Sequence, residues 1–404
     1  MKRSFKYRAY PQNDATEQAA WNWLHLCRRL YNTCLEQRID AYQRYRRSLS
    51  DYTQQLELKT LKVEFPEYAT VGSQVLKDVV RRLDKSYQAF FRKVKMGVEK
   101  PGFPKFKGRD FYRSFVFPNS SGWSMVEKDG QPRILDIKHV GQFRLRGGRG
   151  IQGQIKTVTV RYARSGKWFV VFSCDGVPAT PLAPTGREIA LDMGVNRLLT
   201  DSDGNQVANP EYMERALRRL RILERKKARQ KLGSNRRKQT VKQIAKLYEH
   251  CVNQRDDTAS KTARDYAQRF DRIVVEDLSV AQMVSTDAKC SKLTRRILDA
   301  KWTGFRSKLE NKAEEFGREV VAVDPAYTTR TCNKCGYVHD RPVVSMTFAC
   351  PWCGNVSDRP MNSAQNVKIG RPSPPKRTNG KASCARRNVS HQTERASQTP
   401  QTGG

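Results

Sequence analysis

The hydrophobic pattern of the first 95 residues changes from alternating to helical. Phe5, Tyr7 and Ala9 alternate with polar residues ahead of Pro11, which predicts one strand with these three side chains on one face. From about residue 14 to 95, apolar residues recur every three or four positions, which predicts helices. The recurring side chains that we interpret as core are Trp21, Leu24, Cys27, Leu30, Tyr31, Val80, Leu83, Tyr87, Phe90 and Phe91.

Residues 97–121 break the helical pattern with Gly97, Pro101 and Pro104. Alternating segments separated by glycine-rich turns follow, and they predict antiparallel strands of a small barrel. We expect the first strand to join them, so that the helical residues are an insertion into a β domain. The alternating segments are FRLRG (143–147), KTVTVRYARSG (156–166) and KWFVVFSCDGV (167–177).

The linker PATPLAPTGR (178–187) separates this half from a second pattern that mixes strands and helices. A strand–turn–strand segment comes first, a strongly basic helical hairpin second, and then a buried strand, a helix and a last strand. The tail from residue 371 is rich in Pro, Ser, Thr, Gln and basic residues, which predicts disorder. The expected elements are 187–205, 211–269, 271–280, 292–316 and 318–325.

Charge indicates the class of partner. The chain has 76 Lys and Arg residues against 40 Asp and Glu, a formal net charge of +36. So large an excess repels itself unless a polyanion neutralises it, so we expect a nucleic-acid partner. There is no run of 18 apolar residues, and the basic start lacks an apolar segment, so we expect no membrane partner, no secretory signal and an intracellular protein.

Four of the ten cysteines have the spacing of a metal site. Cys332 and Cys335 form one C-x2-C pair, fourteen residues follow, and Cys350 and Cys353 form a second pair. Four thiolates complete a tetrahedron around one zinc ion and leave no position open, which predicts a structural site. A redox pair is the alternative. We expect the other six to be thiols in a reducing compartment: Cys27, Cys34, Cys174, Cys251, Cys290 and Cys384.

Two acids follow apolar strands. Asp192 ends the strand in EIALDMGV, and Glu276 ends the strand in RIVVEDL. Carboxylates at the ends of adjacent buried strands could share two divalent metals acting on a phosphodiester. Either acid alone is explained as well by a turn cap, but together on a basic chain they suggest an RNase H-like nuclease core. The third acid of such a core would begin the helix in SDRPMNSAQNVKI, where Pro360 suits the first turn.

These motifs together resemble the TnpB family, transposon-encoded RNA-guided nucleases ancestral to compact type V CRISPR effectors. The resemblance covers roughly residues 1–369. Its most specific pieces are PGFPKFKGRDFYRSF, IALDMGVNRLLT, IVVEDLSV, VDPAYTTRTCNKCG and CPWCGNVSDRPMNSAQN.

The resemblance implies a multidomain α+β fold. We expect a wedge-like β-barrel (1–12 and 97–182), an inserted helical recognition domain (13–96), a RuvC-type RNase H-like α/β domain (186–326 and 356–370), an inserted zinc ribbon (327–355) and a disordered basic tail (371–404). The implied partners are a guide RNA and a double-stranded DNA target beside a short adjacent motif. A monomeric ribonucleoprotein in the prokaryotic cytoplasm, associated with the nucleoid, is the corresponding expectation.

By motif, the resemblance assigns Asp192 and Glu276 to the first and second acidic positions. The third motif of the family is D-x-D-x-N-A-A-x-N, and its second aspartate binds metal. That position is Pro360 here, while Asp358 matches only the first, non-catalytic aspartate. Proline offers no side-chain oxygen to Mg²⁺, so we expect cleavage to fall on the order of 10³-fold or more. Asp358 could swing in as a relocated acid, and that alternative stays open.

Several basic residues are candidates for nucleic-acid contacts. Lys77 is near where the family recognises the adjacent motif, or it is simply a solvated lysine. Lys105, Lys107 and Arg109 alternate with Phe103, Phe106 and Phe111, which suggests backbone and stacking contacts with RNA. The basic hairpin could line the guide–target heteroduplex, or be a solvated charged helix. Its candidates are Arg218, Arg219, Arg225, Lys226, Lys227, Arg236 and Arg237.

Three functions remain open from the sequence. The first is an RNA-guided DNA-binding protein that does not cleave and represses transcription by occupying its target. The second is an active, Mg²⁺-dependent RNA-guided endonuclease that uses Asp192, Glu276 and a relocated acid. The third is a zinc-ribbon nucleic-acid-binding protein with a decayed nuclease core and no guide.

Overall fold

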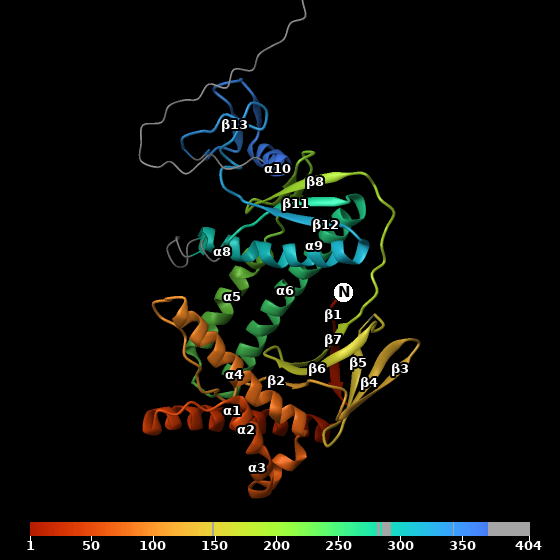
Figure 1. Cartoon of the computed structure of the whole chain (residues 1–404), viewed down its shortest axis with the longest axis vertical. Helices are drawn as coiled ribbons and strands as arrows, with labels where there is room; N and C mark the ends of the chain where they lie inside the picture. The colour runs from red at the N-terminus through yellow and green to blue at the C-terminus, as the bar shows by residue number, and fades with distance from the viewer. Residues whose placement is uncertain (148, 281–282, 285–291, 342, 371–404) are drawn as a thin grey trace, which may run out of the picture.

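The computed structural model describes residues 1–147, 149–280, 283–284, 292–341 and 343–370. The tail expected to be disordered, and two of the scattered cysteines, Cys290 and Cys384, lie outside these ranges. Figure 1 shows an elongated molecule with the helices α1 (Asp14–Tyr45) to α4 (Ser73–Lys95) at one end, two sheets along its length and a small unit that carries β13 (Thr347–Ala349) at the other end. This small unit contains Cys332, Cys335, Cys350 and Cys353. In the described part of the chain, no helix is long and apolar enough to cross a membrane.

The first sheet is antiparallel and has the strand order β2-β6-β7-β1-β5-β4-β3. As predicted, the first strand joins the later ones, because β1 pairs with both β7 and β5. Phe5, Tyr7 and Ala9 are all buried, as expected from their alternation. The strands are β1 (Arg3–Pro11), β2 (Ser114–Phe117), β3 (Trp123–Lys128), β4 (Gln131–Ile137), β5 (Gly141–Arg146), β6 (Gln154–Ala163) and β7 (Lys167–Asp175).

The prediction of a small barrel needs correction on two points. Among the described residues no pairing joins the edge strands β2 and β3, so the sheet is a half-barrel rather than a closed one. The β3–β4 hairpin was also missed, because its residues alternate weakly and β3 is mostly exposed. Its turn residues Asp129 and Gly130 both have positive φ, 54° and 65°, and an Asp-Gly pair is a signal for such a hairpin turn.

The helical insertion packs against this sheet in one continuous core. Asn13 caps the first helix, since its side chain accepts a hydrogen bond of 2.8 Å from the Thr16 amide. The core prediction is wrong for Phe91, which is 56% exposed in the last turns of α4, and Phe90 is only half-buried. The elements are α1 (Asp14–Tyr45), α2 (Asp51–Leu56), α3 (Leu58–Glu64), the 3₁₀ turn η1 (Pro66–Thr70) and α4 (Ser73–Lys95).

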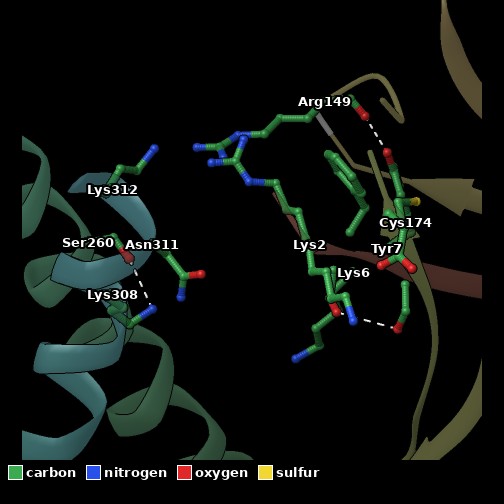
Figure 2. Close-up of a pocket in the computed structure, with 14 residues that line it drawn as sticks. Lys2, Lys6, Tyr7, Arg149, Cys174, Ser260, Lys308, Asn311 and Lys312 are labelled. Carbon is green, nitrogen blue, oxygen red and sulfur yellow. Dashed lines mark hydrogen bonds between the residues drawn. The ribbon is translucent and has the colours of Figure 1, made fainter. Parts of the chain in front are cut away.

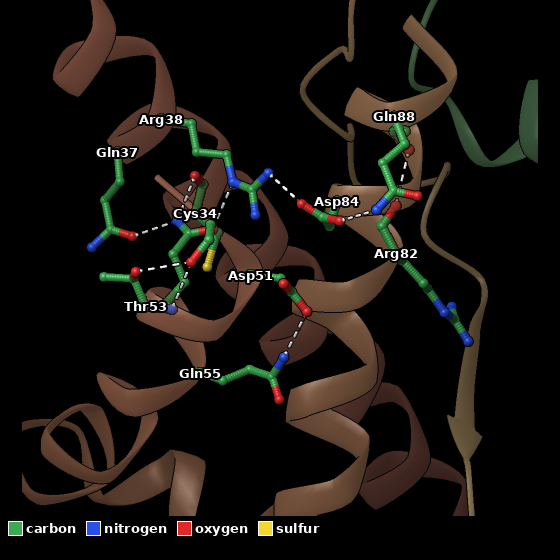
Figure 3. Close-up of polar contacts among 12 residues, drawn as sticks. Cys34, Gln37, Arg38, Asp51, Thr53, Gln55, Arg82, Asp84 and Gln88 are labelled. Atoms are coloured by element: carbon green, nitrogen blue, oxygen red, sulfur yellow. Dashed lines mark hydrogen bonds and ion pairs between the residues drawn. The ribbon is translucent and has the colours of Figure 1, made fainter. Parts of the chain in front are cut away.

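A buried polar network fixes these helices relative to one another (Figure 3). The Arg38 guanidinium of α1 donates to Gln54 of α2 at 2.8 Å and to Asp84 of α4 at 2.9 Å. Gln54 in turn donates to the backbone oxygen of Cys34 at 2.9 Å. Arg38 is only 7% exposed, so removing Gln54 or Asp84 would leave its buried charge without a partner. The network therefore holds α2 and α4 in fixed positions on α1.

The second sheet has the order β10-β9-β8-β11-β12; β8, β11 and β12 are parallel to one another, and β9 pairs antiparallel with both β8 and β10. The helical hairpin is present as predicted, whereas the single helix expected over 292–316 is divided at Lys301, whose φ is 50°. The elements are β8 (Glu188–Met193), β9 (Arg197–Asp201), β10 (Gln206–Ala208), α5 (Tyr212–Arg229), α6 (Asn235–Arg269), β11 (Arg272–Glu276), α8 (Lys292–Ala300), α9 (Trp302–Phe316) and β12 (Glu319–Val323).

Helices cover both faces of this sheet. Residues of α6, α8 and α9 pack on one face, against Ile189, Leu191 and Val275. Val367, from α10 (Arg359–Ile369), packs on the opposite face against Ala190 and Val274. Figure 1 shows α10 between the sheet and the terminal unit, which contains the short strands β13 (Thr347–Ala349) and β14 (Val356–Asp358).

The predicted linker is held against the second half of the chain. The amides of Thr180 and Leu182 donate to backbone oxygens at the end of α9, at 2.7 and 3.1 Å. The Asp271 carboxylate accepts hydrogen bonds from Thr185 and from the amide of Gly186. The segment that connects the two sheets is therefore held by hydrogen bonds to α9 and to Asp271.

Candidate functional site

The strand register brings the two predicted acids to the same level. Leu191 of β8 lies opposite Val275 of the parallel strand β11. The next residues, Asp192 just before the last residue of β8 and Glu276 at the end of β11, are therefore side by side. Leu191 and Val275 face the helices α6, α8 and α9. Since successive side chains alternate between faces, both acids point to the other face, toward α10.

Asp192 and Glu276 line one pocket of about 290 Å³. Glu276 is only 4% exposed and accepts a hydrogen bond of 2.7 Å from the Thr328 hydroxyl. Burial raises the pKa of both carboxyls, and the charge of Asp192 raises the pKa of Glu276 further. Two buried carboxylates that disfavour each other's ionisation are an arrangement that a bound divalent cation would stabilise.

Pro360 lies in this pocket too, where the first turn of α10 faces the acids. Pro360 is buried, and its side chain offers no oxygen to an ion. Its neighbour Arg359 also lines the pocket, and this cation lowers the pKa of Asp192, against the larger effect of burial. A guanidinium beside the acids opposes the binding of a second cation.

Asp358 is near this pocket but does not line it. Its carboxylate accepts from the Arg197 guanidinium at 2.7 Å, and its negative charge contributes to the raised pKa of Asp192. Among the described residues, the four cysteines are the only group of three or more His, Cys, Asp or Glu side chains placed to hold a metal ion. The structure thus brings two acids together, places Pro360 beside them and leaves Asp358 in an ion pair.

The asparagines of α10 have a role that sequence reasoning missed. The Asn362 amide donates to the backbone oxygen of Thr331 at 2.7 Å and accepts from the amide of Asn333 at 2.9 Å. Asn366 donates to the backbone oxygens of Thr328 and Thr331 at 2.9 and 2.7 Å. The two asparagines are one helical turn apart, a spacing that places both on one face, and they hold segment 328–333 to the helix.

The four predicted zinc ligands converge. Their sulfurs all lie within 4.8 Å of one another, with Cys332 to Cys353 at 3.7 Å and Cys335 to Cys350 at 3.5 Å. Tetrahedral zinc with bonds of about 2.3 Å requires sulfurs about 3.8 Å apart, so the cluster fits such an ion. In each pair the amide of the following glycine donates to the first cysteine's oxygen at 3.0 Å, and both glycines have positive φ.

Some of the basic residues predicted to contact nucleic acid are exposed, and others are half-buried or bind other residues of this chain. Lys77 is half-buried on α4. Arg237 donates to the backbone oxygens of Lys227 and Gln230, which closes the turn between α5 and α6, and Lys227 pairs with Glu224. Lys107 is half-buried. The remaining candidates are exposed: Lys105, Arg109, Arg218, Arg219, Arg225, Lys226 and Arg236.

A large basic cleft between the two halves of the chain was not predicted. It has a volume of about 740 Å³ and lies between strands β1 and β7 on one side and helices α6 and α9 on the other. Figure 2 shows Lys2, Lys6 and Arg149 on the sheet side, across the gap from Lys308 and Lys312. The cations at residues 2, 3 and 6 belong to the basic start of the chain, which was the available signal.

Three family models match separate parts of the chain. Residues 160–287 match the model described as "Probable transposase", residues 302–367 match "Cas12f1-like, TNB domain", and residues 1–47 match "Helix-turn-helix domain".

Named relatives match over longer stretches. The "Putative RNA-guided DNA endonuclease InsQ" of Escherichia coli (strain K12) is 30% identical over 307 residues, 73% of this chain and 73% of the relative. The "Putative RNA-guided DNA endonuclease" of Streptomyces pristinaespiralis is 28% identical over 372 residues, 91% and 89% of the two chains. The "TnpB-like protein L770" of Acanthamoeba polyphaga mimivirus is 24% identical over 283 residues, which are 68% of this chain and 49% of the relative.

Proposed function

The chain belongs to the TnpB family, and we propose that it is an RNA-guided DNA-binding protein that cleaves its target weakly or not at all. It would bind a guide RNA and a double-stranded DNA target beside a short adjacent motif, as a monomeric ribonucleoprotein. Occupying the target would then repress transcription. The observation that carries this proposal is Pro360 in the acidic pocket, at the position of the third acid.

The architecture around the pocket supports a RuvC-like core. A five-stranded sheet with parallel β8, β11 and β12 carries the acids at the ends of two adjacent strands, and α10 faces them. A Mg²⁺ ion bound there would stabilise the attacking and leaving oxygens of a phosphodiester. Asp192 and Glu276 would hold it and Thr328 would orient Glu276, whereas Pro360 contributes no ligand. Losing that stabilisation corresponds to about 4 kcal/mol, or on the order of 10³-fold in rate.

The cysteine cluster is proposed to hold a structural zinc ion in a zinc ribbon. Its sulfur separations of 3.5 and 3.7 Å support this assignment, and four thiolates leave no open position for a reactive water. The ion would position segment 328–333, which carries Thr328 next to Glu276.

Binding of guide RNA is supported by the distribution of positive charge. The basic cleft of about 740 Å³ and the exposed arginines of the α5–α6 hairpin offer the cations that neutralise phosphates. In such an assembly base pairing supplies sequence specificity, and the protein contacts the backbone and a short duplex motif.

The test is a cleavage assay on the ribonucleoprotein purified with its own RNA. With Mg²⁺ and a DNA target matched to that RNA, we expect tight binding in a gel-shift experiment and little or no cleavage. Turnover that Asp192→Ala abolishes would overturn the proposal of deficient cleavage while leaving RNA guidance intact. Absence of a discrete co-purified RNA would instead support the guide-free nucleic-acid-binding alternative.

A second candidate function is an active endonuclease that uses Asp358. The favouring observation is that the charge of Asp358 already reaches Asp192 and raises its pKa. The ion pair with Arg197 would have to break first. Arg197→Ala should therefore increase any cleavage if Asp358 is the relocated acid, and Asp358→Asn should remove it.

A further inference from the structure

The loop between α4 and β2 is held in place although it has no regular secondary structure. The Asn32 side chain of α1 accepts from the Lys107 amide at 2.8 Å and donates to the Lys107 oxygen at 3.1 Å. Pro104 and Tyr112, on either side of Lys107, are buried. The loop is therefore anchored to the fold at three points along its length.

This anchored loop nevertheless presents aromatic rings to solvent. Phe106 is 55% exposed and Phe111 is 68% exposed. Phe103 differs from them, because its ring packs edge-on against Tyr87 and Phe90 at 5.5 and 5.3 Å. Exposing large apolar rings costs free energy in water, and here the anchors prevent the loop from burying Phe106 and Phe111 by rearrangement.

A cation lies over one of the exposed rings, and others are close to both in the sequence. The Arg164 guanidinium lies over the ring of Phe111, 5.5 Å from its centroid. Lys105 and Arg109 are exposed neighbours in the loop. His25 of α1 is close enough to respond to these charges: burial lowers its pKa, and the positive charges of Arg109 and Arg28 lower it further.

We propose that Phe106 and Phe111 form a stacking site for unpaired nucleotides, with Lys105, Arg109 and Arg164 contacting the phosphates. Aromatic rings in a positively charged groove are how proteins bind single strands without sequence preference, because every base has a face that can stack. A rigid anchor lowers the entropy lost on binding, which the Asn32 contact provides. A protein partner fits less well, since the surroundings are cationic. The proposal adds a single-strand site to the proposed function and does not depend on cleavage.

The experiment measures anisotropy of fluorescein-labelled oligomers of twelve uridines, twelve deoxythymidines and a twelve-base-pair DNA duplex, using the full chain. Phe106→Ala and Phe111→Ala should each weaken single-strand binding by roughly 5- to 100-fold and leave duplex binding unchanged. Phe106→Tyr and Phe111→Tyr should retain affinity, whereas Phe106→Leu should lose it, because leucine keeps apolar area but cannot stack. The matched control is Phe91→Ala, since Phe91 is 56% exposed and lies outside the loop.

The outcomes separate the possible sources. A larger loss on uridines assigns the site to RNA, and a larger loss on deoxythymidines assigns it to a displaced DNA strand. Lys105→Ala and Arg109→Ala should each reduce the slope of log affinity against log salt by about 1, while the phenylalanine variants leave it unchanged. Equal losses on single strands and duplex, or full affinity in Phe106→Leu, would overturn the stacking site. Such a failure leaves co-purification of RNA unaffected, so it is distinguishable from failure of guide binding.

Discussion

The cysteine cluster and the acidic pocket are two metal-type sites that share one stretch of chain, and they differ in completeness. Four sulfurs converge within 4.8 Å, whereas the pocket contains two carboxylates and Pro360. Asn362 and Asn366 hold segment 328–333 to α10 and do not rely on the side chain at position 360. If Pro360 replaces a metal ligand, as we propose, the surrounding scaffold would persist without that ligand, because Asn362 and Asn366 bind backbone oxygens.

The largest expected effect comes from removing one ligand of the four-cysteine cluster. Cys350→Ser should abolish zinc binding and unfold the cysteine-containing unit, because binding free energies of structural zinc are on the order of 10 kcal/mol and include the folding of the unit. Metal analysis and limited proteolysis at residues 332–358 check this. Cys174→Ser, which alters a buried cysteine of β7, should keep about one zinc per chain. Zinc retained in Cys350→Ser would show that the cluster is not the site.

The second largest effect is expected from adding a carboxylate to the acidic pocket. Pro360→Asp places a carboxylate at the proposed third acidic position, and it should raise Mg²⁺-dependent cleavage on the order of 10³-fold if the rest of the pocket is intact. Single-turnover cleavage of a matched target measures the change. Pro360→Asn is the control, since it removes the proline without adding charge and should stay close to the parent rate. Equal rates in the two variants would mean that more than one ligand is missing.

The buried carboxyl of Glu276 should make the free energy of unfolding depend on pH. Burial holds the pKa of Glu276 above its unfolded value, so the folded protein binds more protons than the unfolded protein between those two pKa values. Stability should therefore fall as pH rises through the folded pKa. Glu276→Gln keeps an acceptor for Thr328 and should be more stable than the parent at pH 8, on the order of 2 kcal/mol, with the difference shrinking toward pH 5. Denaturant unfolding at both pH values tests this, and an unchanged difference would argue against a strained carboxyl.

The smallest effect concerns the contact that the two sites share. Asn366→Ala removes the donor to the backbone oxygens of Thr328 and Thr331, and should cost about 1–3 kcal/mol because these groups are buried. Urea denaturation measures it. The control is Lys368→Ala on the exposed face of α10, expected to change stability by less than about 0.5 kcal/mol. If Asn366→Ala also lowers zinc retention, the two sites are coupled through segment 328–333.

Local patterns predicted most of the elements, because periodicity and turn residues act over a few positions. The first strand, the helical insertion and the basic hairpin were foreseen in type and place. The division of the helix at Lys301, the missing barrel closure and the β3–β4 hairpin were not. Phe91 shows the limit of periodicity: it recurs at helical spacing, yet its ring is mostly exposed near the end of α4.

What the sequence determined by itself is the set of groups available. It contains the four cysteines at ligand spacing, the two acids that follow apolar segments, and a proline where the family resemblance leads us to expect a third acid. What only the tertiary structure decided is which groups meet. The parallel register of β8 and β11 brings Asp192 level with Glu276, and Arg197 draws Asp358 into an ion pair. Such distances depend on strand pairing and helix packing between residues more than 80 positions apart, which no local pattern specifies.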